Sequence, residues 1–167
     1  MTAMPADLLA SPLLASPLMA LLPLPLTLPA SVIDLRRHIL PDTLTLALLV
    51  TGLLVAGLGE PEAGAILLRL AEAALVFGLI GSLRALHARL RGRIGLGLGD
   101  VKFLAAATAW TGLAQVPLLI LVASLAALAV LAAASLAGHR IGATTRLPFG
   151  PFLALGLHTA LWLMPPA

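Results

Sequence analysis

The sequence has 167 residues, of which 60% are hydrophobic and only 10% are charged, and its formal net charge is +3. Because a soluble domain is about half apolar and about a quarter charged, this chain has too few charges to cover a water-exposed surface. The sparse basic residues argue against nucleic-acid binding, which needs a basic face on a folded domain. The absence of cysteine excludes disulfides and thiolate metal sites within these residues.

The apolar residues favour helices over strands. Most of them are Leu and Ala, only 4% of the chain is aromatic, and no stretch alternates between polar and apolar positions. No soluble domain of useful size fits between the apolar segments. We therefore expect an all-α fold: residues 1–167 form one polytopic, membrane-embedded unit with about six transmembrane helices and the lipid bilayer as its solvent.

The first two predicted spans are residues 8–33 and 43–59. A spanning helix needs about 20 apolar residues, and residues 8–33 carry no charge. Five prolines interrupt this region, so we expect an irregular, kinked, Pro-rich span. No Lys or Arg precedes it, which argues against a cleaved signal peptide. Asp42, directly after Pro41, is a plausible N-cap for the second span.

The third predicted span, residues 63–83, contains the charged residues Arg69 and Glu72. Residues at this i, i+3 spacing are neighbours on one face of a helix. A charge within a membrane is by default a candidate functional residue, but here we interpret the two as a structural ion pair. The following segment, residues 84–93, is predicted to be a basic loop.

The remaining apolar segments predict three more spans. No charge occurs from Phe103 to Gly138, a length sufficient for two spans. The sequence AQVP at residues 114–117 predicts a hinge between them. The last predicted span covers residues 148–164.

The arginines alternate along the chain in a pattern that predicts its orientation. Basic residues gather in three loops, and the two turns between them hold no Lys or Arg. By the positive-inside rule, the basic loops face the cytoplasm and both termini lie outside it. Asp34, Asp42, Asp100 and Lys102 then all lie at cytoplasmic helix ends. The basic loops are residues 35–41, 84–93 and 139–147, and the turns are residues 59–62 and 114–117.

Two aspartates from distant parts of the chain thus reach the same membrane face. Asp34 ends the first span and Asp100 begins the fourth. Two carboxylates a few ångström apart near low dielectric do not both ionise, so they share a proton. The charged member can take a proton from a water that attacks a peptide carbonyl. The neutral member can donate a hydrogen bond to the developing oxyanion, which is the chemistry of an aspartyl protease.

Glycines precede the second aspartate in the stretch GLGLGDVKF, residues 95–103. Gly95, Gly97 and Gly99 leave a strip of backbone without side chains. An extended substrate backbone could approach closely there. Alternatively, the glycines only allow neighbouring helices to pack closely. Both interpretations remain open at this point.

Three separated blocks of sequence match a known family in the right order. They are DLRRHILPDTLTL at 34–46, GLGLGDVKFLAAATAWTG at 95–112 and LPFGPFLALG at 147–156. Together they resemble the type IV prepilin peptidases, membrane aspartyl proteases of the GxGD class. The resemblance extends from about residue 31 to the end. Ile94 stands where family members often carry Glu, which puts a substrate or loop contact in doubt but not the aspartate pair.

The resemblance implies which residues form the site. Asp34 and Asp100 match the two catalytic aspartates, and Asp42 is a rival for Asp34 that we assign to helix capping. Lys102 could screen the carboxylate pair or hold an oxygen, or it could anchor the chain at the lipid headgroups. The candidate substrate-binding residues are Gly97, Gly99, Lys102, Phe149, Gly150 and Pro151.

The last block also allows two interpretations. Phe149, Gly150 and Pro151 begin a helix at the same membrane face as the aspartates, so they are candidates to line the site. The alternative is that the Gly-Pro pair simply starts a helix.

We expect neither a metal nor a cofactor. His38, His87 and His139 fall in three different predicted loops and His158 in the last span, so no pair has the spacing of a helical ligand set. Larger members of the resembled family also methylate the new N-terminus with S-adenosylmethionine and carry paired CxxC motifs that can hold zinc. Since this chain has no cysteine, we expect cleavage without methylation.

The leading prediction is an aspartic endopeptidase of the bacterial inner membrane with its active site facing the cytoplasm. The resemblance implies that it removes a short basic leader, ending in glycine, from prepilins or pseudopilins of type IV pilus and type II secretion systems. Residues 84–93 would repel such a leader, so we assign them to anionic lipid and topology.

Two alternatives remain at this stage. The first is a small ion-coupled transporter or proton-relay protein that uses Asp34 and Asp100 as an ion site. Inverted repeats would favour it, and the two halves of the chain show no convincing match. The second is an inactive relative that helps to assemble a secretion system.

Overall fold

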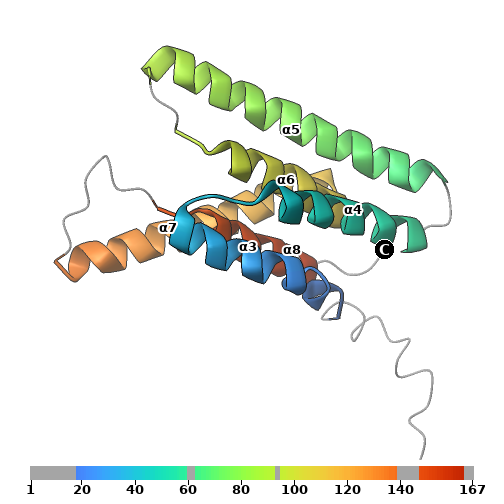
Figure 1. The fold of residues 1–167 in the computed structure, drawn as a ribbon, viewed down its shortest axis with the longest axis horizontal. Coiled ribbons are helices and arrows are strands. Elements are labelled where there is room, and N and C mark those ends of the chain that lie inside the picture. The colour runs from blue at the N-terminus through green and yellow to red at the C-terminus, as the bar shows by residue number, and fades with distance from the viewer. Residues whose placement is uncertain (1–17, 60–62, 93–94, 139–146, 164–167) are drawn as a thin grey trace, which may run out of the picture.

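Helices make up most of the structure. The computed structural model describes residues 18–59, 63–92, 95–138 and 147–163, and Figure 1 shows their arrangement. The predicted all-α fold class is confirmed for these residues. The helices are α3 (Leu24–Arg37), α4 (Asp42–Gly59), α5 (Ala63–Arg91), α6 (Leu98–Thr111), η1 (Leu113–Gln115, a 3-10 helix), α7 (Val116–Leu136) and α8 (Gly150–Leu163).

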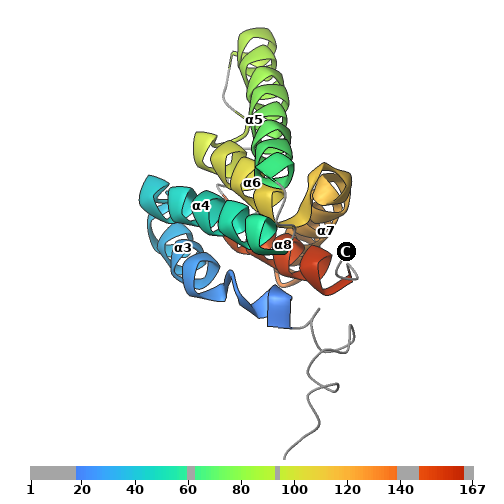
Figure 2. The same ribbon diagram turned by 90° about the vertical axis from the view of Figure 1, so that its right-hand side faces the viewer.

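Helix α6 occupies the centre of the bundle. It packs against α4, α5 and α8, while α8 also packs against α3 and α7. Its buried residues include Ala105, Ala106, Ala107 and Ala109. Small side chains let several helices approach one backbone closely. Figure 2 shows α5 projecting at one edge of this group, over α6.

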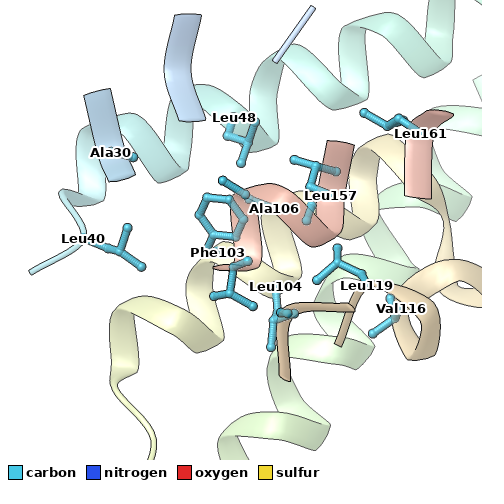
Figure 3. Close-up of a cluster of buried hydrophobic side chains, with 14 of the residues drawn as sticks. Ala30, Leu40, Leu48, Phe103, Leu104, Ala106, Val116, Leu119, Leu157 and Leu161 are labelled. Atoms are coloured by element: carbon cyan, nitrogen blue, oxygen red, sulfur yellow. The ribbon is translucent and has the colours of Figure 1, made fainter. Parts of the chain in front are cut away.

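The apolar core joins helices that are far apart in the sequence. Phe103 of α6 is 1% exposed and belongs to the same buried cluster as Leu48 of α4, Leu119 of α7 and Leu157 of α8. Figure 3 shows these side chains together. Since lipid tails are as apolar as these side chains, the close packing stabilises the bundle mainly through van der Waals contacts between the helices, and so the core fixes how the helix ends are arranged.

Two glycines mark places where helices touch. A Cβ at Gly52 of α4 would lie 2.6 Å from Trp110 Cδ1, and the Trp110 indole N–H donates to the Leu48 carbonyl at 2.8 Å. A Cβ at Gly156 of α8 would meet the backbone oxygen of Leu119 in α7. The helix pairs α4–α6 and α7–α8 are therefore held at distances that only glycine permits at these positions.

Two stretches of helix are long and apolar enough to cross a membrane. Gly64–Arg91 has 28 residues with a mean hydropathy of 1.9, and Leu113–Leu136 has 24 residues with a mean hydropathy of 2.7. Asp42–Leu58 and Gly150–Leu163 are shorter apolar helices. Only 11% of the most apolar part of Gly64–Arg91 is buried, whereas a core helix of a soluble protein would be mostly buried. These features fit a membrane protein.

The predicted loop at residues 84–93 is wrong, because α5 continues as a helix to Arg91. No proline interrupts this stretch, and Arg, Ala and Leu are strong helix formers. The helix ends at Gly92, whose φ of 65° lies in the left-handed region. At 1.5 Å per residue, α5 is about 43 Å long, which exceeds the hydrocarbon thickness of about 30 Å.

The other predicted boundaries agree more closely with the structure. α4 and α8 match the predicted spans 43–59 and 148–164, apart from the residues after Leu163, which lie outside the described part. The hinge predicted at 114–117 is observed slightly earlier, from Gly112 to Gln115, and Pro117 lies in the first turn of α7.

The first span is irregular where it is described, as predicted. A short helical turn at residues 18–21 is followed by a break at Leu22 and Pro23, and α3 then continues to Arg37. Residues 8–17 of the predicted span lie outside the described residues, as do 60–62 of the first predicted turn and 139–146 of the last predicted loop.

Candidate active site

Asp34 lies on α3, one turn before the helix ends, and is 5% exposed. The turn is closed by His38, which has a φ of 55° and whose N–H donates to the Asp34 carbonyl. The backbone N–H of Gly150, the first residue of α8, donates to Asp34 Oδ2 at 2.8 Å. A helix N-terminus presents free N–H groups and a positive partial charge, so it suits a carboxylate.

Gly150 occupies a position that has no room for a side chain. A Cβ there would lie 2.8 Å from Asp34 Oδ2 and 3.0 Å from Leu40 Cδ2. Phe149 packs instead against Phe152, with ring centroids 6.2 Å apart. The predicted segment at the start of α8 therefore meets Asp34 through its glycine backbone.

Asp100 lies in the first turn of α6, outside the two stretches that are long enough to cross a membrane. Gly97 is the N-cap of this helix, which makes Asp100 the third helical residue. The carboxylate lies over Gly97, since a Cβ there would be 2.9 Å from Asp100 Oδ2. Asp100 thus occupies the position of the acidic residue in a capping box and takes a hydrogen bond from the Gly97 backbone, while Gly97 has no side chain to complete the motif.

The environment of Asp100 disfavours its charged form. Burial and the negative charge of Asp34 raise the pKa of Asp100 from 3.8 to about 6, and a hydrogen bond from the Gly97 backbone opposes this rise. The two aspartates predicted to form the site are thus close enough to influence each other electrostatically.

Leu40, which the sequence analysis did not single out, lies between the two parts of the site. It is 6% exposed, and it fills the space beside two glycines. A Cβ at Gly99 would lie 3.0 Å from Leu40 Cβ, just as one at Gly150 would meet Leu40 Cδ2. The available signal was one apolar pair, Ile39 and Leu40, within an otherwise basic loop.

The glycine strip is filled by side chains of the protein itself. Gly97 faces Asp100, Gly99 faces Leu40, and a Cβ at Gly95 would lie 3.0 Å from the His87 ring. Gly99 already belongs to α6, so the strip is extended only up to Gly97. These contacts account for close packing, and a role in substrate binding stays a prediction.

Lys102 binds Asp42 rather than either member of the aspartate pair. Its Nζ lies 2.7 Å from Asp42 Oδ1 and 2.8 Å from Oδ2. Asp42 is the first residue of α4, one position inside the N-cap predicted for it, because the Pro41 carbonyl already accepts from the Thr45 N–H. Asp42, the alternative to Asp34 as a catalytic residue, therefore forms an ion pair with Lys102.

An apolar groove of about 470 Å³ lies between α4, α5 and α6. Thr45, Leu49 and Phe77 are among the residues that line it, together with the Asp42–Lys102 pair. Neither Asp34 nor Asp100 belongs to its lining. The groove is thus a feature separate from the aspartate pair.

The basic end of α5 contacts the loop before Asp100, which the sequence analysis missed. Arg84 Nε donates to the Leu96 carbonyl at 2.9 Å, and His87 packs against Gly95. The signal was their i, i+3 spacing, which places both on one helix face. It was overlooked because the segment was predicted to be a loop.

The ion pair predicted within the third span is confirmed. Arg69 Nη1 lies 3.2 Å from Glu72 Oε2. Arg69 also packs against Gly112, where α6 ends. A cation beside a helix C-terminus is stabilising, which supports the structural interpretation of this pair.

His158 joins α8 to the N-terminal part of the bundle. Its Nδ1 lies 2.5 Å from the Ala20 carbonyl oxygen, and its Nε2 lies 2.9 Å from Thr27 Oγ1. Within the described ranges, no three His, Asp or Glu side chains are placed to hold a metal ion. We therefore assign His158 to helix packing.

Comparisons with known proteins identify the family. The family model for the type IV leader peptidase family matches residues 20–132. Three similar proteins bear the name prepilin leader peptidase/N-methyltransferase. The one from Burkholderia pseudomallei (strain 1026b) is 40% identical over 131 residues, which are 77% of this chain and 41% of that protein. The one from Escherichia coli (strain K12) is 38% identical over 135 residues, or 77% and 56% of the two chains. The one from Pseudomonas aeruginosa is 37% identical over 144 residues, or 81% and 46%.

The chain spans about half the length of the curated relatives it matches. No solved structure is significantly similar to it. Because the family model covers well over half of the chain and includes both Asp34 and Asp100, the chain belongs to the type IV leader peptidase family.

Proposed function

We propose that this chain is a membrane aspartyl endopeptidase that cleaves the leader peptide of type IV prepilins or pseudopilins. Asp34 and Asp100 are its catalytic pair. The observation that carries this proposal is the electrostatic coupling of two carboxylates from distant segments, in which the charge of Asp34 helps to raise the pKa of Asp100 to about 6. A pair that shares one proton is what aspartyl proteolysis requires.

In the proposed mechanism the shared proton resides on Asp100. Ionised Asp34 takes a proton from a water molecule as the water oxygen bonds to the scissile carbonyl carbon. Asp100 donates a hydrogen bond to the oxyanion that forms. When the carbon–nitrogen bond breaks, the proton held by Asp34 passes to the leaving amine. The hydrogen bond from the Gly150 N–H to Asp34 Oδ2 supports the role of Asp34 as the charged member.

We further propose that the substrate-binding residues are Gly97, Gly99, Lys102, Phe149, Gly150 and Pro151. Gly97 and Gly150 each lie against one of the two carboxylates, so a peptide that reaches both carboxylates passes beside them. Lys102 holds Asp42. Its proposed role therefore requires that its Nζ leave that partner when substrate binds.

The proposed topology has about six transmembrane helices, with the active site at the cytoplasmic face of the inner membrane. Figure 1 supports it: the C-terminal ends of α3 and α5 and the starts of α6 and α8 lie at the same end of the bundle. The last turns of α3 and α5 carry Arg36, Arg37, Arg89 and Arg91. Excess Arg marks the cytoplasmic side.

Co-expression with candidate prepilins tests the proposed function. The host should lack any prepilin peptidase of its own, and leader removal is scored by mass and by N-terminal sequencing of the product. We expect cleavage directly after the glycine that ends the leader. A correctly inserted protein that leaves every candidate prepilin uncut would contradict the proposal.

Cleavage without methylation stays a prediction, which rests on the lack of cysteine in the sequence. Mass spectrometry of the mature substrate from the same co-expression tests it. A free N-terminal amine is expected, and a methylated amine would show that this chain needs no cysteine-bound zinc to methylate.

A further inference from the structure

Two side chains at the basic end of α5 contact the loop that leads to Asp100. Arg84 Nε donates to the Leu96 carbonyl at 2.9 Å, and the His87 ring lies against Gly95. The Arg84 side chain is partly buried by this contact, whereas Arg89 and Arg91 on the same helix end are exposed. Arg84 thus has a protein partner in addition to any role at the lipid surface.

The carbonyl that Arg84 holds belongs to the same peptide group as the N–H of Gly97. This group is planar and trans, so its oxygen and its hydrogen point in opposite directions. On the hydrogen side, Gly97 is the N-cap of α6, and the Asp100 carboxylate lies over it. Arg84 therefore holds the carbonyl of a peptide plane whose Gly97 end provides the backbone hydrogen bond to Asp100.

We propose that Arg84 is a positioning residue for Asp100, acting through the Leu96–Gly97 peptide. By holding the carbonyl, the guanidinium fixes the plane that aims the Gly97 N–H at the carboxylate. It also polarises the peptide and so strengthens that donor. The loop needs such a restraint because Gly95 and Gly97 have wide conformational freedom. The inference rests on the proposed function, since positioning matters only if Asp100 acts in catalysis.

The charged groups around Asp100 determine in which direction its pKa should change when Arg84 is removed. Asp34 of α3 raises the pKa of Asp100, and the Gly97 backbone lowers it. Arg84 and His87 of α5 lie across the loop, and Lys102 is bound to Asp42 of α4. Removal of Arg84 frees the peptide to rotate and removes a positive charge. Both changes raise the pKa of Asp100 further.

The test compares Arg84→Gln and Arg84→Met with Arg84→Lys and with the control Arg89→Gln, which removes the same charge from an exposed position. We expect Arg84→Gln and Arg84→Met to lower kcat about ten- to a hundredfold with little change in KM, because a misplaced catalytic group costs rate of this order. The alkaline limb of the kcat profile should move to higher pH. Arg84→Lys should recover part of kcat, and Arg89→Gln should behave like the wild type.

An infrared titration measures the protonation of the Asp100 carboxyl group without any substrate. The carbonyl band of the protonated carboxyl is followed against pH in lipid vesicles and is assigned by its loss in Asp100→Asn. It should persist to higher pH in Arg84→Gln than in the wild type. An unchanged titration in a folded Arg84→Gln protein would overturn the inference, as would an equal shift in Arg89→Gln.

Folding failure is also an informative outcome. If both Arg84→Gln and Arg84→Met fail to insert or fold, Arg84 serves the stability of the fold and the positioning role is wrong. A wild-type protein that cuts no prepilin contradicts the proposed function instead. The infrared comparison separates the two failures because it needs no substrate.

Discussion

The surroundings of the Asp100 side chain disfavour its ionised form. The first turn of a helix and the Gly97 backbone favour the ionised form, yet burial and the nearby Asp34 prevail and raise the pKa of Asp100 to about 6. When folding raises the pKa of a carboxyl group, its ionised form at neutral pH lowers the stability of the folded state. The proposed proton donor is therefore also a source of instability.

Replacing Asp100 by the neutral Asn should stabilise the protein at pH 7.5. The folded state raises the pKa of Asp100 from 3.8 to about 6, so its stabilising contribution is complete below about pH 4 and is lost as the pH rises through about 6. Since Asn does not ionise, Asp100→Asn should avoid this loss of stability and raise Tm at pH 7.5 by a few degrees. Thermal unfolding at pH 5 and pH 7.5 checks it, and a lower Tm of the variant at pH 7.5 would contradict the environment described for Asp100.

Gly150→Ala should impair the site more than the fold. The new Cβ would lie 2.8 Å from Asp34 Oδ2, so the carboxylate must move away from the Gly150 N–H. Cleavage should fall by about tenfold or more. The matched control is Gly78→Ala in α5, where a Cβ would meet nothing within 4 Å. Equal activity of the two variants would show that Asp34 tolerates displacement.

At the scale of elements, the sequence predicted the helices better than their ends. Apolar runs and prolines marked α4, α7 and α8 because a continuous apolar stretch must be buried in lipid or protein. The basic end of α5 was predicted to be a loop because the uncharged stretch before it ends at Leu83, although the Arg, Ala and Leu residues that follow favour a helix. The contact from Arg84 to Leu96 depends on tertiary packing, which the sequence pattern does not encode.

The sequence also did not show which charged side chains pair with one another. Asp34 and Asp100 were identified by their place at helix ends and by the resemblance, and in the structure the charge of Asp34 contributes to the raised pKa of Asp100. Lys102 was grouped with them by the resemblance and by its predicted place at the same membrane face. On a helix, residues two apart point in nearly opposite directions, and Lys102 accordingly reaches Asp42.

Gly156→Ala should loosen the contact between α7 and α8. The new methyl group would meet the backbone oxygen of Leu119, and a backbone gives way less easily than a flexible side chain. Overpacking of this kind costs about 1–3 kcal/mol. Thermal unfolding in detergent should show a lower Tm than for the control Gly64→Ala, where a Cβ has open space. A Tm equal to that control would contradict the close approach of the two helices.

At the scale of the whole molecule, the helices place Asp34, Asp100 and the arginines in the last turns of α3 and α5 at one end of the bundle. Figure 1 shows this end, where α3 and α5 finish and α6 and α8 begin. A site at this end of a membrane bundle would place the proposed cleavage at the membrane surface.

Accessibility labelling tests the proposed orientation. Cysteines are introduced by Ala88→Cys near the end of α5 and by Gln115→Cys in η1, into a sequence that has no cysteine of its own. A membrane-impermeant thiol reagent added to intact cells should label residue 115 and leave residue 88 unlabelled until the membrane is opened. Labelling of residue 88 in intact cells would reverse the orientation.

The most direct test of the central claim measures cleavage by single Asp→Asn variants in lipid vesicles. Asp34→Asn and Asp100→Asn should each insert normally and lose at least about a hundredfold in kcat, because an amide can neither accept the proton from water nor share one. Asp42→Asn serves as the matched control. Its pair with Lys102 is exposed on the Asp42 side, and exposed ion pairs contribute about 0–1 kcal/mol, so most of the activity should remain. Substantial cleavage by Asp34→Asn or Asp100→Asn would contradict the assignment of these two residues as the catalytic pair.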